Sequence, residues 1–446
     1  MAGLRAAAGA TWRARAALLA SRVMAGATFR ALQHRNFRLF LAGQLVSLIG
    51  TWMQNVAQSW LIYRLTGSPL LLGLTSFAGQ APVFFLAAVG GAVADRRPRR
   101  SVLLATQTAS MALAFAFATL TLSGLVRAWH VFVLAAALGA VNAFDMPARQ
   151  AFVVEMVGKV DLANAIALNS SMFNGARVLG PSIARLLVAA FGEGWCFFAN
   201  GVSFLAVIGG LAAMRLPPPR LAKPSGGPLT HAAEGFRFVV RTSPMRAVLL
   251  LLAASGVTAM PYAVLMPVFA DRVLHAGARG LGVLMGASGL GALAGALALA
   301  SRESARGLGR WVAVAAVEFG AALVLFSLSR ALWLSAALLV LAGGGMMVQT
   351  AASNTLVQTM TPDALRGRVM AVYAMTIVGL SPLGAVLAGG AATRIGAPAA
   401  VAGGGAVSIA CALLFATRLP ALRAEARRLA ASGRLGTADG ARVPSD

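Results

Sequence analysis

Residues 91–100 read Gly91-Ala-Val-Ala-Asp95-Arg96-Arg97-Pro98-Arg99-Arg100, a basic stretch that directly follows a long run of apolar residues. Arginines at the end of an apolar segment resist transfer across a bilayer and hold the loop on the cytoplasmic side. Gly91 permits close approach of two helices, and the Asp95 carboxylate can face the positive N-terminus of a neighbouring helix. A loop that only fixed topology would need the positive charges alone, so the acid favours a structural contact.

Twelve apolar stretches, one of which ends in this loop, divide the chain. Mean hydropathy is +0.78, 59% of the residues are hydrophobic and 11% are charged, a balance that the surface of a water-soluble domain does not tolerate. A membrane-spanning helix needs about 20 apolar residues. The predicted spans are residues 39–63, 70–94, 101–123, 129–152, 163–191, 195–213, 246–270, 280–301, 310–328, 331–352, 367–391 and 397–417. The expected fold class is an all-α polytopic membrane protein with twelve transmembrane helices.

Basic residues crowd alternate connections between these stretches. Of the 38 Lys and Arg residues, 30 lie in the two terminal segments, in the even-numbered connections or at the span ends next to those connections, whereas the odd-numbered connections hold 6. Because Lys and Arg resist translocation, the even connections and both termini are expected to be cytoplasmic. The predicted location is a bacterial cytoplasmic (inner) membrane, crossed many times.

Hydrophobicity falls sharply between Met214 and Ser243, which predicts a linker between two halves. The predicted domains are a basic cytoplasmic extension (1–37), a six-helix bundle (38–213), a cytoplasmic linker (214–244), a second six-helix bundle (245–418) and a cytoplasmic tail (419–446). In the extension, an interfacial helix, a solvated segment and a translation start at Met24 instead of Met1 are the alternatives. Weak likeness between the halves places Gly73 against Gly282 and Pro181 against Pro382, as expected for parallel repeats with a substrate site between them.

The net charge of +25 raises nucleic-acid binding as a function class. The arginines are spread over many loops instead of one stripe, so attraction to anionic lipid head groups explains them more simply and no nucleic-acid partner is expected. Cys196 and Cys411 lie in apolar stretches, and the four histidines show no metal-ligand spacing. The sequence therefore predicts neither a metal site nor a cofactor, and it is compatible with a monomer.

Polar residues form a stripe along the first span. The stripe consists of Gln44, Ser47, Thr51, Gln54, Asn55 and Gln58. Lipid cannot hydrogen-bond to amides, so the stripe must face either a wet cavity or another helix. We interpret Gln54, Asn55 and Gln58 as cavity-lining residues that bind substrate, with polar bonding between helices as the alternative.

Charged residues within the spans supply further candidates. Asp145 and Arg149 share a face of the fourth span, where they form either a structural ion pair or a proton-coupling and gating pair. Arg177 lies near the middle of the fifth span and needs a partner, which is Asp145, a helix carbonyl or an anionic substrate. Glu318 in the ninth span is either structural or a second proton site.

Two tyrosines are the substrate-binding candidates of the second half. Tyr262 follows Pro261, and together with Pro267 this proline is expected to interrupt the seventh span. Broken helices commonly line transport sites. Tyr373 lies in the eleventh span and completes the predicted substrate-binding set of Gln54, Asn55, Gln58, Arg177, Tyr262 and Tyr373.

The loop at residues 91–100 resembles the signature between the second and third helices of the major facilitator superfamily, Gly-x-x-x-Asp-Arg-x-Gly-Arg-Arg. The matching residues are Gly91, Asp95, Arg96, Arg99 and Arg100, whereas Pro98 replaces a glycine. The likeness implies the major facilitator fold of two six-helix bundles and a role for this loop as a conformational latch. Further stretches, among them Gly50-Thr51-Trp52-Met53-Gln54 and Arg366-Gly367-Arg368-Val369-Met370, are similar to the branch containing siderophore exporters and macrolide efflux proteins.

The fifth span is similar to the antiporter motif of that superfamily. Gly180 and Pro181 match it, while alanine twice and Arg185 replace three of its glycines. The likeness implies secondary active export, commonly against an inward proton flux. The hypothesis is therefore a carrier with alternating access that exports a small amphiphilic or anionic molecule and uses protons as coupling ion. The alternative hypotheses are an importer, a non-transporting sensor or assembly protein, and a membrane enzyme. The spans contain no clustered nucleophile, metal set or phosphate-binding motif, which counts against an enzyme.

Overall fold

The computed structural model describes residues 29–158, 160–215, 228–301, 307–362 and 365–431. Within these ranges the chain is helical throughout and contains no strand. The predicted extension (1–37), linker (214–244) and tail (419–446) lie partly outside the described residues. The all-α fold class is thereby confirmed.

Six long helices follow a short 3₁₀ turn, η1 (Arg30–Gln33), in the first half. They are α2 (Arg35–Thr66), α3 (Pro69–Arg96), α4 (Arg99–Leu122), α5 (Ala128–Val157), α6 (Leu162–Phe191) and α7 (Glu193–Ala212). The break between α2 and α3 is explained by two capping residues. Gly67 adopts a left-handed conformation (φ 61°) that caps α2, and Ser68 accepts a hydrogen bond from the Leu71 amide to start α3.

The second half begins with an amphipathic helix, α8 (Pro228–Arg241). The remaining elements are α9 (Ser243–Thr258), η2 (Met260–Leu265), α10 (Met266–Val268), η3 (Phe269–Val273), α11 (Gly277–Ala300), α12 (Leu308–Leu328), α13 (Leu332–Met360), α14 (Arg366–Ala374), η5 (Met375–Gly379), α15 (Leu380–Ile395) and α16 (Ala397–Ala431). The 3₁₀ turn η2 begins beside Pro261, so the predicted interruption of the seventh span is confirmed. A π-helical segment, η5, similarly joins α14 to α15.

Ten of the described helices are long and apolar enough to cross a membrane. The two further long helices are α2 and α6, with 32 and 30 residues. Both are of crossing length, and both carry the intramembrane polar residues singled out from the sequence. The chain is therefore a multi-pass membrane protein. Helices α2 and α6 are long enough to cross a membrane but are less apolar than the other ten.

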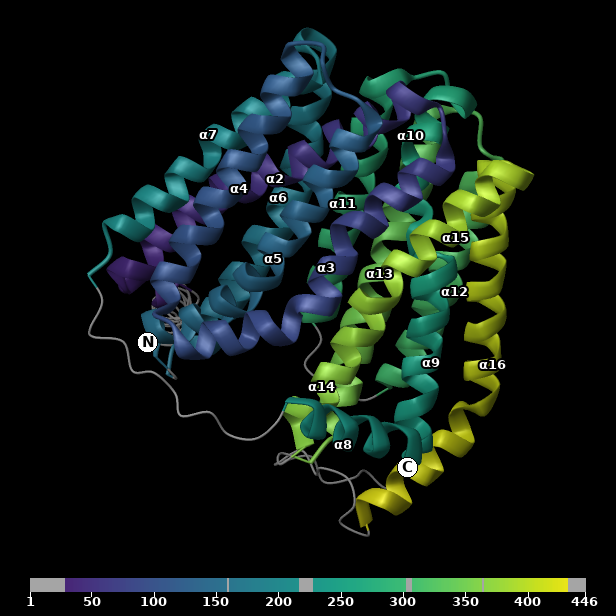
Figure 1. Ribbon diagram of the computed structural model, residues 1–446. Coiled ribbons are helices and arrows are strands. Elements are labelled where there is room, and N and C mark those ends of the chain that lie inside the picture. The colour runs from purple at the N-terminus through teal and green to yellow at the C-terminus, as the bar shows by residue number, and fades with distance from the viewer. Residues whose placement is uncertain (1–28, 159, 216–227, 302–306, 363–364, 432–446) are drawn as a thin grey trace, which may run out of the picture.

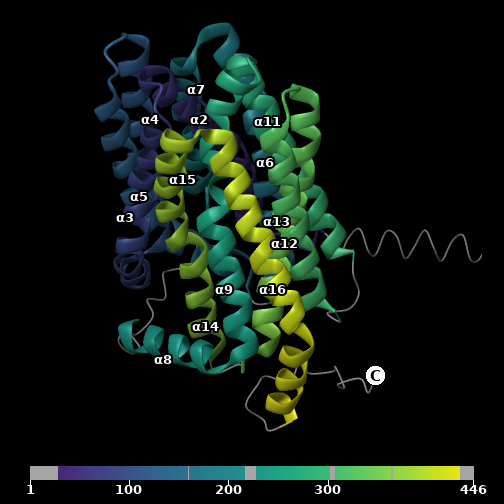
Figure 2. The same cartoon turned by 90° about the vertical axis from the view of Figure 1, so that its right-hand side faces the viewer.

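The two halves stand side by side (Figure 1), with α2–α7 in one and α9–α16 in the other. We call the end at which α8 lies the linker end and the opposite end the distal end. Helix α8 runs across the linker end, roughly perpendicular to the long helices (Figure 2). Two helix pairs join the halves: α3 packs on α15, and α6 packs on α11.

Glycines make these two crossings close. A Cβ at Gly73 in α3 would overlap the backbone of Ala385 in α15, and a Cβ at Gly282 in α11 would lie 2.5 Å from the Arg185 Cβ in α6. The two glycines are those that the likeness between the halves matched. Each half thus contributes the corresponding glycine to one of the two crossings.

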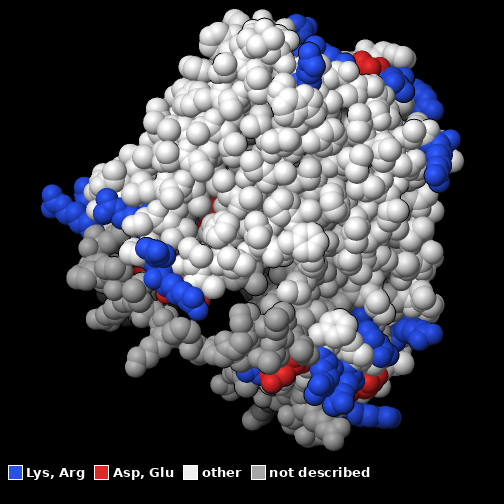
Figure 3. All heavy atoms as spheres, viewed as in Figure 1, with Lys and Arg blue, Asp and Glu red and all other residues white. Residues whose placement is uncertain are grey.

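Charged side chains gather toward the two ends of the molecule, and the surface between them is nearly free of charge (Figure 3). This pattern is the one that a bilayer requires of the helices that it surrounds. The chain reaches beyond the expected last span without a break, since α16 continues to Ala431. The first part of the predicted tail is therefore helical.

Close packing of α11 on α13 gives a stability prediction. A Cβ at Gly343 would overlap the backbone of Ser288, whereas one at Gly344 would lie 3.5 Å from the Gly291 carbonyl oxygen, an ordinary contact. We expect Gly343→Ala to lower the free energy of unfolding by about 1–3 kcal/mol through overpacking. Gly344→Ala, the control, should be neutral or slightly stabilising because alanine favours helices. Thermal unfolding in detergent measures both, and equal melting temperatures would contradict the prediction.

Candidate functional site

A cavity of about 510 Å³, which we call the central cavity, lies between the two halves. Its walls come from α2, α3 and α5 in the first half and from η2, α11 and α15 in the second. Polar atoms are supplied mainly by amides and hydroxyls. The polar lining residues are Asn55, Gln58, Ser59, Thr75, Ser76, Gln80, Asn142 and Ser381. A space with this mixed lining suits a small amphiphilic molecule, because it offers hydrogen bonds and apolar surface together.

Two of the predicted substrate-binding amides, Asn55 and Gln58, line this cavity. Gln54 does not: it is 3% exposed, and its Oε1 accepts a hydrogen bond of 2.7 Å from Asn200 Nδ2 in α7. At about 100° per residue, neighbouring positions on a helix point in clearly different directions. The stripe on α2 therefore divides, with Gln54 bonded to another helix and Asn55 facing the cavity.

Arg177 lies on α6 beside the cavity wall. Its guanidinium carbon is 5.7 Å from the centre of the Trp52 ring, and Trp52 itself lines the cavity. The Arg177 charge is also within electrostatic reach of the Tyr262 hydroxyl. Asp145 is not its partner. Across the described ranges no carboxylate pairs with Arg177, which leaves its charge balanced only by an aromatic face.

The two tyrosines occupy different places. Tyr262 is buried, its hydroxyl lies 2.6 Å from Ser288 Oγ, and the preceding Pro261 lines the cavity. Tyr373 is 5% exposed and donates a hydrogen bond of 2.8 Å to the Thr350 carbonyl oxygen, away from the cavity. Tyr262 is thus next to the candidate site, and Tyr373 packs within the second half.

Asp145 and Arg149 form the ion pair that their spacing predicts. Asp145 Oδ2 lies 2.9 Å from Arg149 Nη2, and Oδ1 accepts hydrogen bonds from Thr106 Oγ1 (2.9 Å) and Gln107 Nε2 (2.8 Å). The Asp145 side chain is 4% exposed, whereas that of Arg149 is 27% exposed. Three donors from α4 and α5 thus converge on one buried carboxylate. The pair lies within the first half, outside the central cavity.

Glu318 lies on α12, which packs on α13 and α16 at the side of the second half. Its side chain is exposed on the outer face. It is not among the lining residues of the central cavity. Any role of Glu318 therefore acts from outside the candidate pathway.

The basic loop between α3 and α4 makes contacts only within the first half, as far as the described residues go. Arg99 Nη1 lies 2.7 Å from Glu155 Oε1, and Arg100 Nη2 donates to the Ala212 carbonyl oxygen at 2.8 Å. Asp95 and Arg96 are exposed, and among the described residues the Asp95 carboxylate makes no hydrogen bond or ion pair, so the structural contact expected of the acid is not present in this conformation. A Cβ at Gly91 would meet nothing within 4 Å, so no close approach depends on that glycine here.

Sequence reasoning missed a contact that joins the two halves at the distal end. Arg272 Nη2 in η3 donates a hydrogen bond of 2.9 Å to the Gly67 carbonyl oxygen, and its guanidinium carbon lies 5.7 Å from the centre of the Tyr63 ring. The carbonyl belongs to the C-terminal end of α2, where the helix dipole favours a cation. The signal was present: Arg272 is one of the few basic residues in the odd-numbered connections.

It also missed the polar residues of α3, Thr75, Ser76 and Gln80, which face the cavity. Gln80 Nε2 donates to Ser76 Oγ at 2.9 Å. Three polar side chains in an otherwise apolar span were a readable signal. Among the residues that the structure describes, no three His, Cys, Asp or Glu side chains gather into a group that could hold a metal ion.

Three bacterial transport proteins are similar to this chain in sequence. The enterobactin exporter EntS of Shigella boydii is 28% identical over 361 residues, which cover 80% of this chain and 85% of that protein. The multidrug efflux pump Tap of Mycolicibacterium fortuitum is 29% identical over 378 residues, 80% of this chain and 89% of that protein. The staphyloferrin A transporter of Staphylococcus aureus is 22% identical, and the match spans 56% of this chain and 62% of that protein.

Solved structures give the fold independently. A nucleoside transporter, NupG, superposes with a TM-score of 0.67 at 14% identity and covers 86% of this chain and 98% of its own. A bacterial homologue of the lysosomal transporter Spinster, solved inward-facing and unoccupied, gives a TM-score of 0.63 at 16% identity and covers 88% and 97%. The family described as transmembrane secretion effector matches residues 26–436. The chain therefore belongs to the transmembrane secretion effector family of major facilitator superfamily transporters.

Proposed function

We propose that this protein is a secondary active transporter that exports a small amphiphilic or anionic molecule, siderophore- or drug-like, from the bacterial cytoplasm by proton antiport. One observation carries the proposal: amides from both α2 and α5 line a cavity between the halves, and Arg177 lies beside its wall without a carboxylate partner. Such a site binds a molecule that presents an anionic group and an apolar body.

Alternating access requires that the cavity open at one end at a time. In this proposal all twelve long helices, α2 and α6 included, span the membrane as two six-helix bundles, and the linker end with both termini faces the cytoplasm. The glycine crossings and the Arg272 contact close the distal end, as expected for a state that receives cargo from the cytoplasm. The basic loop with Gly91, Asp95, Arg96, Arg99 and Arg100 would latch the linker end in the opposite state, when the exposed Asp95 meets the second half.

The proton is assigned to the pair of Asp145 and Arg149. Protonation of Asp145 would neutralise the carboxylate and release Arg149, whose Nη1 lies 3.4 Å from Gln44 Oε1 on α2. Because α2 also supplies Asn55 and Gln58, a change at Asp145 can reach the cavity through one helix. Glu318, on the outer face, has no part in this route.

The test uses inverted membrane vesicles that carry a proton gradient, to which candidate siderophores and drugs are added. We expect cargo to dissipate the gradient in the wild type, and Asp145→Asn to abolish that dissipation while cargo still binds. Glu318→Gln is the control, because it removes an intramembrane acid outside the route and should leave dissipation unchanged. Dissipation unaffected by Asp145→Asn would overturn the assignment, and cargo accumulation without any gradient would overturn active export.

An importer of the same fold is the alternative, and it predicts the opposite direction of cargo movement in the same vesicles. Two of the similar proteins are named as an exporter and an efflux pump, which favours export. A non-transporting sensor would need no polar cavity between the halves. The amide-lined cavity therefore favours transport over that second alternative.

A further inference from the structure

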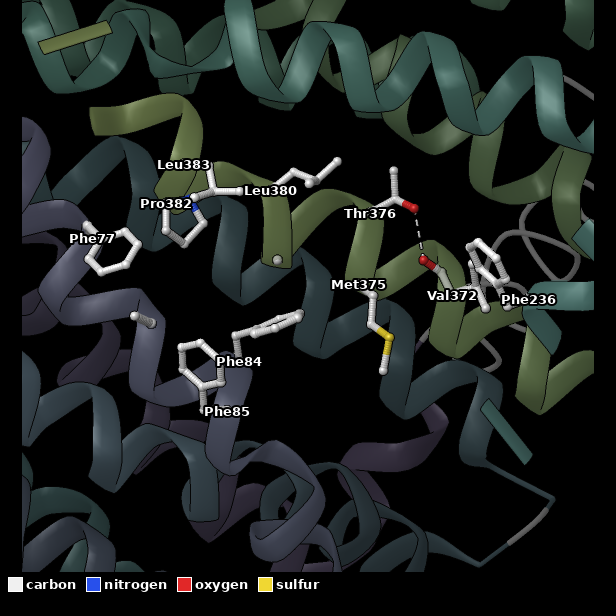
Figure 4. Close-up of a pocket in the computed structure, with 12 residues that line it drawn as sticks. Phe77, Phe84, Phe85, Phe236, Val372, Met375, Thr376, Leu380, Pro382 and Leu383 are labelled. Atoms are coloured by element: carbon white, nitrogen blue, oxygen red, sulfur yellow. Dashed lines mark hydrogen bonds between the residues drawn. The ribbon is translucent and has the colours of Figure 1, made fainter. Parts of the chain in front are cut away.

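A second cavity, of about 590 Å³, opens on the side of the molecule between α3 and the segment from α14 to α15 (Figure 4). Its lining is almost wholly apolar. The lining residues are Phe77, Ala81, Phe84, Phe85, Phe236, Val372, Met375, Thr376, Gly379, Leu380, Pro382 and Leu383. Several of them are strongly exposed, including Phe85 at 72% and Met375 at 50%. We call this space the lateral cavity.

The lateral cavity and the central cavity share two walls. On α3, Ser76 and Gln80 face the central cavity, while Phe77 and Ala81 face the lateral one. On the other wall, Ser381 lines the central cavity, whereas its neighbours Leu380 and Pro382 line the lateral cavity. Adjacent residues of the same two helices thus separate an amide-lined space from an aromatic one.

The partition between the cavities is weakest toward the linker end. Near the distal end α3 and α15 are in backbone contact, since a Cβ at Gly389 would lie 2.6 Å from the Pro69 carbonyl oxygen. At Gly379 the nearest group is instead the Phe84 ring, whose Cε2 would lie 2.7 Å from an added Cβ. Figure 4 shows Phe84 reaching from α3 toward the opposite wall. A ring can rotate aside where a backbone contact cannot.

The helix opposite Phe84 is irregular at the same level. Residues 375–379 form the π-helical segment η5, and Thr376 Oγ1 donates to the Val372 carbonyl oxygen at 2.9 Å. Single π-helical turns are frequent at functional sites because they widen the helix locally. Gly379 ends this segment, so both sides of the partition can yield here.

We propose that the lateral cavity is an entry site that takes the apolar part of an anionic amphiphile directly from the bilayer and passes it beside Phe84 to the central cavity. The aromatic lining and the exposure of Phe85 and Met375 suit an alkyl or aryl group that arrives through lipid. Arg177, near the central cavity, then receives the anionic group. This inference rests on the proposed transport of an amphiphile.

The test measures occupancy without transport, so that it can succeed or fail separately from the proposed function. Phe85→Trp places a reporter in the lateral cavity, and Val314→Trp on α12 places a matched reporter at an exposed site (51%) outside it. Both proteins are reconstituted in phosphatidylcholine vesicles and titrated with dibromostearate, whose bromines quench tryptophan emission on contact. The emission of the wild type is subtracted.

We expect saturable quenching, several-fold stronger at low dibromostearate content, for Phe85→Trp and a linear, weaker response for Val314→Trp. Adding Ala81→Phe should fill the cavity and abolish the saturable component. Val89→Phe, on the same helix and outside the lining, should leave that component unchanged. Equal linear quenching at both reporters would overturn the proposal, as would saturable quenching by dibrominated phosphatidylcholine, which would assign the cavity to bulk lipid.

Transport separates the two claims. If energised vesicles show no cargo movement while dibromostearate quenching saturates, the lateral cavity binds amphiphiles but is not an entry site for cargo, and the proposed export fails with it. If the wild type moves cargo but quenching stays linear, export stands and lateral entry fails.

Discussion

Arg177→Gln should weaken the transport of anionic cargo about ten- to hundredfold, because a hydrogen bond to a charged group contributes about 1.5–3 kcal/mol and each 1.4 kcal/mol is a factor of ten. The loss should fall on KM for anionic compounds and spare neutral analogues. Arg177→Lys should recover only part of the affinity, since an ammonium cannot form the two parallel hydrogen bonds of a guanidinium. Uptake into inverted vesicles at varied cargo concentration measures each case.

Arg185→Gln is the matched control for this prediction. It removes the same charge from the same helix. Neither arginine is a lining residue of the cavity, but Arg177 contacts Trp52, which lines it, whereas Arg185 packs against Gly282 at the crossing of α6 and α11. Its effect should be small and equal for anionic and neutral compounds. If Arg177→Gln reduced the transport of both kinds of compound equally, its role would be to position Trp52 and not to bind charge.

Asp145→Ala should lower the free energy of unfolding by about 3–5 kcal/mol, the usual cost of removing one partner of a buried ion pair. The change would leave Thr106, Gln107 and Arg149 without the acceptor that they share. Asp145→Asn keeps an oxygen acceptor and should cost much less. Thermal unfolding of the purified protein in detergent measures the difference.

Glu155→Ala is the control, because it breaks the ion pair between Glu155 and Arg99. The Arg99 side chain is 20% exposed and the Glu155 side chain is 35% exposed. An ion pair of this kind contributes about 0–1 kcal/mol. A similar loss of stability for Asp145→Ala and Glu155→Ala would contradict the view that Asp145 organises the interior of the first half.

Much of the fold could be predicted because spanning helices are constrained by length and apolarity alone. The sequence also placed the broken seventh span and the pairing of Asp145 with Arg149, which depend on proline and on local spacing. The sequence could not predict which residues of the polar stripe on α2 face the cavity and which bond to another helix. Whether Gln54 or Asn55 faces the cavity depends on Asn200, which lies 146 residues away on α7.

The lateral cavity was likewise beyond sequence reasoning. Phe77, Phe84 and Phe85 look like ordinary lipid-facing or core residues in an apolar span, and their common role appears only when α3 lies opposite α15. Such contacts depend on segments that are distant in the sequence, whereas the length of a span depends on one segment alone.

The modest apolarity of α2 has a consequence for how the protein is made. Among the described residues α2 is the first long helix to be synthesised, and its amides are costly to place in lipid. We therefore expect α2 to stay at the insertion machinery instead of partitioning into the bilayer at once. Its Gln54 finds Asn200 only after α7 has been synthesised. We therefore expect the first six helices to be released into the bilayer as a preassembled group, and a chain stalled before Asn200 to be a substrate for membrane proteases.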